Sequence, residues 1–463
     1  MPAEGSGPSS GSTQERAKDG RLGNLATPEN IQKLQAALHA KAKGEPDFRF
    51  YALYDKMYRK DVLEYAYARC RANKGASGVD GERFEEIDTY GADRWIGELA
   101  ETLRKKTYRP QAVKRVYIPK PNGKLRPLSI PTIRDRTAMM AATLILSPIF
   151  EADLPDEQHG FRPGRSAQSA VKEVRSLLDT GHTQVVDADL TDYFGSIPHS
   201  QLMTSVARRV VDRQTLHLIK MWLTAPVQET DDRGRPQRTT RNKDDKRGIP
   251  QGSPISPLLS NLFMRRLVLG WKRLGFERRH GARIVTYADD LVICCRRGAD
   301  EALVALRQIA GRLQLTVNED KTHVCRLPEG RFDFLGYSFA RYYSPKTGRP
   351  YFGSRPSKKS IKRLVDAISV ETERRNLLLD VDAVVERLNL KLQGWANYFC
   401  LGSVSKAYRA VNTHATQRLC RWLCDKHGIQ SNGKARFPAQ YLHDTLGLVY
   451  LPGFQRKYPR APA

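Results

Sequence analysis

The most informative stretch of this chain is the run Ile284-Val285-Thr286-Tyr287-Ala288-Asp289-Asp290-Leu291-Val292-Ile293. Two adjacent aspartates stand between two short apolar segments rich in β-branched residues. This pattern predicts a β-hairpin that carries carboxylates at its tip. Aspartate is also common in ordinary turns, because its side chain bonds the neighbouring backbone. A solvated turn is therefore the alternative when this run is taken alone.

A second acidic segment lies earlier in the chain and reads Gln184-Val185-Val186-Asp187-Ala188-Asp189-Leu190. It resembles a buried strand with an aspartate at its end. Two-metal phosphoryl transfer needs carboxylates that bridge two Mg²⁺ ions about 3.5–4 Å apart. Mg²⁺ prefers oxygen ligands, so a site made of aspartates without His or Cys suits it. The two segments together predict a two-magnesium site for phosphoryl transfer.

The charge of the chain points to a polyanionic partner. Its 463 residues include 77 Lys and Arg against 50 Asp and Glu, which gives a net charge of +27. Such an excess is typical of proteins that bind nucleic acids, although it also increases solubility. The sequence has no run of about 18 apolar residues and no signal peptide, so neither membrane insertion nor export is expected.

Seven cysteines lie mostly within apolar segments. An odd number without export indicates a reducing compartment and buried thiols. Cys420, Cys424 and His427 fall on one face of a predicted helix, which is a possible metal site. A zinc site normally needs a fourth ligand at recognisable spacing, so core cysteines are the favoured interpretation.

Two further segments suit a phosphate-bearing ligand. Asn122-Gly123 separates two β-like runs within residues 114–131, which predicts a hairpin with Lys and Arg along it. An exposed charged edge that resists aggregation is the alternative to a flap over a triphosphate.

Residues 248–261 form a loop rich in Gly and Pro that runs into an apolar helix. Loops of this kind let the backbone approach a ligand closely.

The composition changes along the chain. Residues 1–25 have almost nothing to bury, so this tail is predicted to be disordered. A segment containing Pro and Gly near residues 343–356 marks a boundary. Residues 355–463 then carry 19 Lys and Arg against 8 Asp and Glu, with helical patterns at residues 360–372, 382–399 and 405–426. These features predict a basic helical module.

The ordered set of motifs resembles that of the bacterial group II intron-encoded reverse transcriptases, also called maturases. The matching segments are residues 74–81, 114–136, 158–166, 187–199, 247–261, 287–290, 315–322 and 332–339, with a thumb-like signature at residues 392–399. This resemblance covers roughly residues 27–450. It implies an α+β fold of the right-hand polymerase type, whose palm holds a small antiparallel sheet of ferredoxin-like type.

The resemblance also implies four parts of the chain. These are the disordered tail at residues 1–25, fingers and palm at 26–345, a helical thumb or maturase X domain at 355–430, and a basic nucleic-acid-binding segment at 431–463. Basic and aromatic residues alternate in this last segment, which suits nucleic-acid contact. A tail that packs on the thumb is the alternative. No Cys-pair nuclease module follows the thumb, so second-strand DNA cleavage is not expected.

Individual residues acquire roles from the same resemblance. The catalytic residues and ligands of two Mg²⁺ ions would be Asp189, Asp289 and Asp290. The incoming deoxynucleoside triphosphate would contact Lys120, Arg126, Leu190, Phe194 and Gln251. RNA would contact Arg162, Arg165, Lys358, Lys359, Lys362 and Arg363. Phe194 would exclude a sugar 2′-hydroxyl, with a core phenylalanine as the alternative. Gly195 stands where many relatives carry a second acidic residue, and no metal-ligand role is expected there.

The expected function is an RNA-directed DNA polymerase that also binds intron RNA to assist splicing and retrohoming. Its partners would be group II intron RNA, an RNA template, a DNA primer or target and dNTPs, in a cytoplasmic, nucleoid-associated ribonucleoprotein of bacteria with no membrane contact. A free-standing cellular reverse transcriptase, for example in phage defence, is one alternative. A splicing cofactor without enzymatic activity is another, although the three intact aspartates argue against it.

Overall fold

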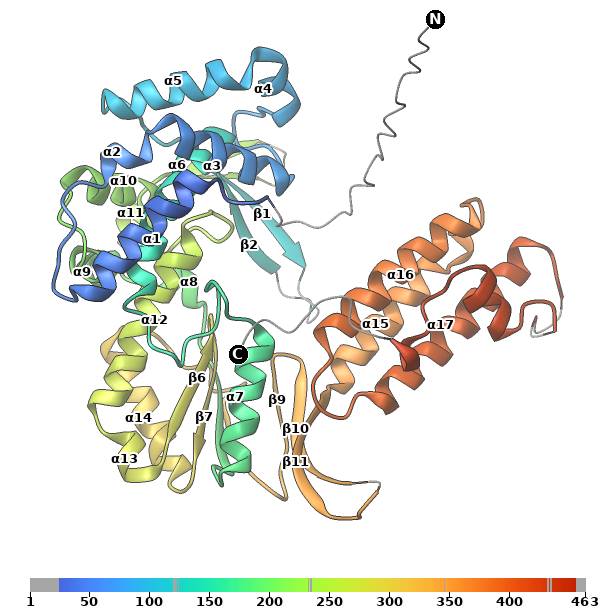
Figure 1. Cartoon of the computed structure of the whole chain (residues 1–463). Coiled ribbons are helices and arrows are strands. Elements are labelled where there is room, and N and C mark those ends of the chain that lie inside the picture. The colour runs from blue at the N-terminus through green and yellow to red at the C-terminus, as the bar shows by residue number, and fades with distance from the viewer. Residues whose placement is uncertain are drawn as a thin grey trace, which may run out of the picture.

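The computed structural model describes residues 25–119, 123, 125–231, 233, 235–344, 346–430, 433 and 435–454. Figure 1 shows an upper lobe, a lower lobe around a central sheet, and a helical lobe to one side. Nearly all of the tail predicted to be disordered lies outside the described residues, as does the end of the basic segment. Within the described ranges, no helix is both long and apolar enough to span a bilayer.

The upper lobe packs around one buried helix, α6 (Ile133–Glu151). A helix that is apolar on most sides is stable only inside a core. Thr132 caps its N-terminus by accepting a hydrogen bond from the backbone N–H of Asp135 at 3.1 Å. The helices before it in the chain are α1 (Glu29–Gly44), α2 (Tyr54–Met57), α3 (Lys60–Ala72), α4 (Phe84–Tyr90) and α5 (Ala92–Arg104).

A four-stranded sheet, in the order β2-β1-β4-β5, also belongs to the upper part of the molecule. Its strands are β1 (Val113–Pro119), β2 (Leu125–Ile130), β4 (Val227–Thr230) and β5 (Pro236–Thr239). The antiparallel pairing of β1 with β2 confirms the predicted basic hairpin. The connecting helices are α8 (Tyr193–Ser196), α9 (His199–Ala207), α10 (Arg213–Leu223) and α11 (Arg241–Asp244).

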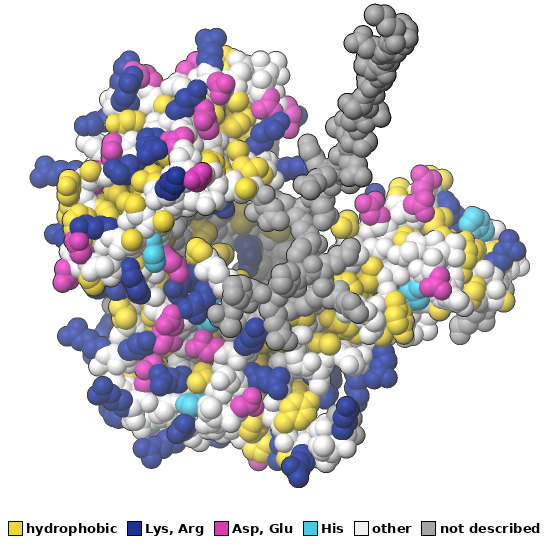
Figure 2. Space-filling model, viewed as in Figure 1, with side chains coloured by type: hydrophobic (Ala, Val, Ile, Leu, Met, Phe, Trp, Pro, Cys, Tyr) yellow, Lys and Arg dark blue, Asp and Glu magenta, His cyan; other side chains and the backbone are white. Residues whose placement is uncertain are grey.

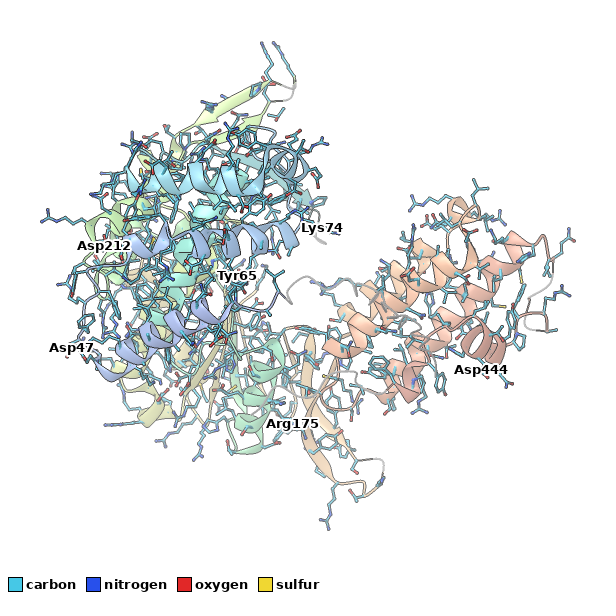
Figure 3. The ribbon with its side chains drawn as sticks, turned by 45° about the horizontal axis from the view of Figure 1, so that its top comes forward. Asp47, Tyr65, Lys74, Arg175, Asp212 and Asp444 are labelled. Atoms are coloured by element: carbon cyan, nitrogen blue, oxygen red, sulfur yellow. The ribbon has the colours of Figure 1, made fainter. Side chains whose placement is uncertain are left out.

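Asp212, labelled in Figure 3, ties two parts of the upper lobe together. Its carboxylate caps α10 by accepting from the Gln214 and Thr215 N–H groups, and it also accepts from the N–H groups of Leu53 and Tyr54. Burial raises the pKa of Asp212, but the four backbone donors outweigh burial and lower it below its ordinary value.

The central sheet is antiparallel throughout and has the strand order β6-β7-β3-β8. Its strands are β3 (Gln184–Asp189), β6 (Arg283–Tyr287), β7 (Asp290–Cys295) and β8 (His323–Arg326). The two acidic segments therefore form neighbouring strands, as their patterns predicted. Helices cover both faces, so apolar residues are needed on both sides of each strand.

Side chains of the central sheet alternate between two hydrophobic clusters. One face packs on α12 (Ser256–Arg273) and α14 (Ala299–Arg312) through Val186, Ala188, Ile284 and Ile293. The other face packs on α7 (Ala167–Asp179) through Val185, Val285, Val292 and Cys294. This second cluster continues into the helical lobe, so the sheet anchors both halves of the molecule.

The helical lobe contains α15 (Lys358–Glu371), α16 (Val381–Tyr398) and α17 (Ser405–Lys426), which confirms the three predicted helices. Shorter turns are η1 (Arg374–Asn376), η2 (Tyr441–Thr445) and η3 (Leu451–Gly453). A three-stranded sheet, in the order β11-β10-β9, leads into this lobe. Its strands are β9 (Phe332–Phe334), β10 (Tyr337–Tyr343) and β11 (Pro350–Pro356).

Two of the motifs noted in the sequence meet at the base of the helical lobe. The Tyr337 hydroxyl donates to the Tyr398 carbonyl, and the Tyr398 hydroxyl donates to the Leu335 carbonyl at 2.9 Å. The Tyr408 hydroxyl donates to the Ala396 carbonyl of α16 at 2.9 Å. Residues 332–339 and 392–399 therefore form one packed junction between sheet and helices.

Candidate active site

The predicted acidic residues meet at one end of the central sheet. Asp189 is the last residue of β3 and lies directly opposite Asp290, the first residue of β7. A two-residue turn, Ala288 and Asp289, joins β6 to β7. The predicted hairpin is confirmed, and it brings Asp189 from a distant segment beside the adjacent pair. In Figure 1, the upper ends of β6 and β7 point toward the space between the lobes.

The turn is braced from below by the segment around Gly160. The residues just before it bond to β6: the His159 N–H donates to the Thr286 carbonyl at 2.9 Å, and the Thr286 N–H donates to the Glu157 carbonyl at 2.8 Å. A Cβ at Gly160 would overlap the backbone nitrogen of Ala288. Ala288 itself has φ +58°, a conformation that costs energy for a residue other than glycine. The brace and the strained turn together fix where Asp289 sits.

The Asp189 carboxylate is held by the loop before β8. Lys321 Nζ lies 2.8 Å from Asp189 Oδ2, and Asn318 Nδ2 lies 3.1 Å from the same oxygen. The Asn318 N–H also donates to the Asp189 carbonyl at 2.8 Å. Residues 315–322 belong to the motifs seen in the sequence, but the sequence alone assigns Asn318 and Lys321 no role. Asn318 directly follows the run Leu315-Thr316-Val317 and Lys321 comes three residues later, and this change from apolar to polar residues is the signal that could have found them.

The carboxylates repel one another and are partly desolvated. Burial and Asp189 raise the pKa of Asp289, while Arg126 and Lys321 lower it. The Asp290 side chain reaches the surface, yet the surrounding protein desolvates it. This desolvation, with the charges of Asp289 and Asp189, raises the pKa of Asp290 to about 6. A cluster of this kind favours a bound cation, because a cation relieves the repulsion.

The candidate ligands are of the chemical type that a hard divalent cation prefers. They are carboxylates on two facing strand positions and the adjoining turn, without His or Cys. Within the part of the chain that the structure describes, however, no three His, Cys, Asp or Glu side chains are grouped closely enough to hold a metal. At this site, Asp189 is bonded to Lys321 and Asn318. Cys420 and Cys424 lie in the hydrophobic core of the helical lobe, which agrees with the favoured interpretation.

Three segments that carry predicted nucleotide contacts are joined by backbone hydrogen bonds. The Ser129 N–H of β2 donates to the Gln251 carbonyl at 2.6 Å, and the Ile249 N–H donates to the Phe194 carbonyl at 2.8 Å. Gly252 has φ +104° and lies against the Ser129 carbonyl. Because glycine has no Cβ, it allows both this φ and the close approach of the Gly/Pro loop to β2. Arg126, three residues before Ser129, is exposed.

The other predicted nucleotide contacts differ in access. Phe194 is half-buried and packs edge-on against Tyr193 with ring centroids 5.7 Å apart. Leu190 is only 3% exposed and its side chain belongs to the core, and the nucleotide contact at this residue stays a prediction. Lys120 lies outside the described residues. A Cβ at Gly195 would overlap the Asp192 carboxylate as this side chain is placed here.

The predicted RNA contacts also divide into buried and exposed groups. Arg162 is buried: its guanidinium pairs with Glu151 at 2.8 Å and donates to the Pro155 and Gln158 carbonyls. These internal partners satisfy the side chain, and an RNA contact by Arg162 stays a prediction. Arg165 pairs with Asp156 at 2.6 Å and is partly exposed. The four cations at the start of α15 are all exposed: Lys358, Lys359, Lys362 and Arg363.

Comparison with known proteins agrees with this arrangement. The family model described as reverse transcriptase (RNA-dependent DNA polymerase) matches residues 118–339, and the group II intron maturase-specific domain matches residues 361–440. YkfC of Escherichia coli is 31% identical over 349 residues, which cover 67% of this chain and 88% of YkfC. The group II intron-encoded protein LtrA of Lactococcus lactis is 33% identical over 239 residues, 51% of this chain and 38% of LtrA.

These matches cover both the sheet with its aspartates and the helical lobe. The reverse transcriptase match ends within β10 and the maturase match begins within α15, so the two families meet at the junction described above. The chain therefore belongs to the group II intron reverse transcriptase/maturase family, in which an RNA-directed DNA polymerase domain is joined to a domain that assists splicing.

Proposed function

We propose that Asp189, Asp289 and Asp290 form the polymerase active site and hold two Mg²⁺ ions. The observation that carries this proposal is the position of Asp189 opposite Asp290, with Asp289 in the adjoining turn. Bound Mg²⁺ would stabilise the charge on the attacking and leaving oxygens of phosphoryl transfer. The protein's own contribution is to fix the carboxylates: Gly160 braces the turn, and Asn318 and Lys321 orient Asp189.

The nucleotide would lie between the carboxylates and the basic hairpin. Arg126 is exposed, and its charge lowers the pKa of Asp289, so it faces the same space as the carboxylates. A guanidinium binds phosphate oxygens bidentately and suits a triphosphate. Gln251 and Phe194 belong to the two loops joined to this hairpin, and the half-buried ring of Phe194 is proposed to exclude a 2′-hydroxyl. Lys120 is proposed as a second phosphate contact from the sequence alone.

The lobes are proposed to act as fingers, palm and thumb. The upper lobe and central sheet, within residues 26–345, would form fingers and palm, and residues 355–430 the thumb. Figure 2 shows the molecule hollowed between the upper and lower lobes, which supports a cleft for template and primer. The Tyr337 and Tyr398 hydrogen bonds support a firm attachment of the thumb to the palm. The basic segment at residues 431–463 is proposed to contact nucleic acid.

The first turns of α15 are proposed to contact intron RNA. Lys358 and Lys359 stand at the N-terminus of this helix, where the helix dipole disfavours positive charge. Cations at an unfavourable and exposed position are better explained by a polyanionic partner than by stability. Arg165 is a further proposed contact. In this proposal the protein works in a nucleoid-associated ribonucleoprotein, with intron RNA, template, DNA target and dNTPs as its partners in splicing and retrohoming.

Primer extension on an RNA template tests the proposal directly. Asp289→Asn removes one charge from the carboxylate cluster without changing the size of the side chain. It should lower cDNA synthesis on the order of 10³-fold or more, because loss of a metal-bound carboxylate costs several kcal/mol. RNA affinity should stay near the wild-type value, because this residue holds metal and not phosphate. Near-normal extension by Asp289→Asn would show that the site is wrongly assigned.

A further inference from the structure

A basic trough lies at the end of the central sheet opposite the carboxylates. Its cavity has a volume of about 830 Å³. It is formed by the end of α7, by α13 (Phe276–His280) and by the first residues of β6 and those that follow β7. Figure 1 shows α13 at the lower edge of the molecule, away from the space between the lobes. The positively charged lining residues are Arg278, Arg279, Arg283, Arg296 and Arg297.

The acidic residues of the trough are already paired. Glu157 contacts Lys272 at 2.5 Å, Glu173 contacts His159 at 2.6 Å, and Glu277 contacts Arg283 at 3.1 Å. The remaining four arginines are exposed. Among the described residues, none of these four has a carboxylate within ion-pair distance: Arg278, Arg279, Arg296 and Arg297. The trough therefore presents a concentrated positive charge to solvent.

Two glycines bring the arginine-bearing segments together. Gly281 has φ +58° and Gly298 has φ +69°, and both allow a close approach. A Cβ at Gly281 would come within 3.0 Å of the Arg296 side chain, and one at Gly298 would overlap the His280 ring. The His280 carbonyl also accepts hydrogen bonds from the N–H groups that follow β7. The arginines thus face one trough because the backbone holds both segments side by side.

The titration of His182 is consistent with a positive potential in the trough. Burial lowers the pKa of His182, and the charges of Arg296 and Arg283 lower it further, against a hydrogen bond to the Leu177 carbonyl that raises it. The chain therefore concentrates cations where they destabilise one another. Repulsion of this kind is relieved by a polyanion.

The trough is remote from the carboxylates. β6 begins at Arg283 and reaches the Asp289 turn at its other end, and β7 runs from Asp290 to Cys295, directly before Arg296. Six residues of strand span roughly 20 Å. A nucleotide bound at the carboxylates therefore does not reach the arginines, and the two ends can act on different parts of a large ligand.

We propose that this trough is a second nucleic-acid-binding surface, which takes the sugar-phosphate backbone of a helical segment outside the polymerase cleft. The arginines come from separate segments and remain exposed, which suits several phosphates along a duplex better than one enclosed nucleotide. Guanidinium groups bind phosphate bidentately. The nearby aromatic ring of Phe276 is stacked on Trp271 with centroids 4.7 Å apart, so it is not free as a platform for an unpaired base.

The choice of RNA as the polymer rests on the proposed function, because intron RNA is the structured nucleic acid that this family serves. A DNA duplex offers the same phosphate chemistry. The test therefore compares an RNA hairpin with a DNA duplex of equal length, each labelled with a fluorophore, over a series of salt concentrations. The full-length protein is used throughout.

The test variant is Arg278→Gln/Arg296→Gln/Arg297→Gln. A matched control, Arg104→Gln/Lys105→Gln/Lys106→Gln, removes the same charge from exposed residues at the end of α5. The trough variant should lose about tenfold in affinity for the RNA hairpin at about 0.15 M salt. Its log–log salt slope should fall by roughly 2–3, because each neutralised phosphate contributes about 0.7–0.9. The salt slope of the control variant should fall by less than half as much as the slope of the trough variant.

The outcomes separate the trough from net charge and from the polymerase proposal. If the trough variant loses affinity for the RNA hairpin, the result supports a surface for the duplex backbone, whether or not its affinity for the DNA duplex falls equally. Three results would overturn the proposal. These are equal losses of RNA affinity in the trough and control variants, no loss of affinity in the trough variant, and a loss of affinity for the DNA duplex alone. Unchanged melting temperature and unchanged extension of a short primed template show that the trough variant is folded. Failure of the wild-type protein to extend a primer would overturn the polymerase proposal only, since the binding result stands without it.

Discussion

The two ends of the central sheet carry opposite charge on the same strands, and they are built differently. At one end, Asp189 is bonded by Asn318 and Lys321, and the Asp289 turn rests on Gly160. At the other end, four exposed arginines have no carboxylate partner among the described residues: Arg278, Arg279, Arg296 and Arg297. Chemistry requires groups fixed to within a fraction of an ångström, whereas binding a polymer backbone requires charge and access. One sheet therefore supplies a rigid site and an adaptable surface.

Among substitutions that leave the three carboxylates intact, the largest effect is expected where a small change disturbs the rigid end. Gly160→Ala places a methyl group against the backbone nitrogen of Ala288 and should push the Asp289 turn out of position. A displacement of about 1 Å can cost roughly 10²-fold in rate, so cDNA synthesis should fall by about that factor. Single-turnover primer extension measures the effect, and RNA affinity should remain unchanged.

Gly97→Ala is the matched control for this substitution. Gly97 lies within α5 and has no atom within 4 Å of its added Cβ. Alanine in a helix interior is more stable than glycine by roughly 0.5–1 kcal/mol, so this variant should keep its activity and melt slightly higher. Equal activity of Gly160→Ala and the wild type would show that the brace does not fix the turn.

A smaller effect is expected at Phe194, which lies beside the rigid end and is only half-buried. If its ring excludes a 2′-hydroxyl, Phe194→Val should raise ribonucleotide over deoxyribonucleotide incorporation by about tenfold in kcat/KM. The discrimination is steric and should not vary with salt. Phe194→Tyr keeps the ring and should keep the sugar preference. A Val variant with lowered stability and unchanged sugar preference would support a purely structural phenylalanine.

The smallest effect is expected where charge is spread over an exposed surface. Reversal of Lys358, Lys359, Lys362 and Arg363 to Glu should flatten the salt dependence of RNA binding, because each phosphate contact contributes about 0.7–0.9 to the slope. Extension of a short primed template should continue at a reduced but measurable rate. An unchanged slope would remove the start of α15 from the RNA interface and leave the trough as the stronger candidate.

The sequence predicted the rigid end well because its residues are locally patterned. The adjacent aspartates at a hairpin tip and the aspartate at the end of an apolar strand are visible without coordinates. The brace at Gly160 was not predicted to contact the turn, because that contact depends on tertiary packing. The trough was not predicted for the same reason: Arg278 and Arg296 become neighbours only through the pairing of β6 with β7. Arg162 shows the same limit, since its burial against Glu151 cannot be read from a basic motif.

Metal dependence tests the central claim most directly. Primer extension on RNA should be absent from the wild-type protein in the presence of a chelator and restored by added Mg²⁺. Asp189→Asn should remain on the order of 10³-fold slower at every Mg²⁺ concentration, while its RNA affinity matches that of the wild type. Extension without any divalent cation, or a wild-type rate in Asp189→Asn, would contradict the assignment of this end of the sheet as the polymerase site.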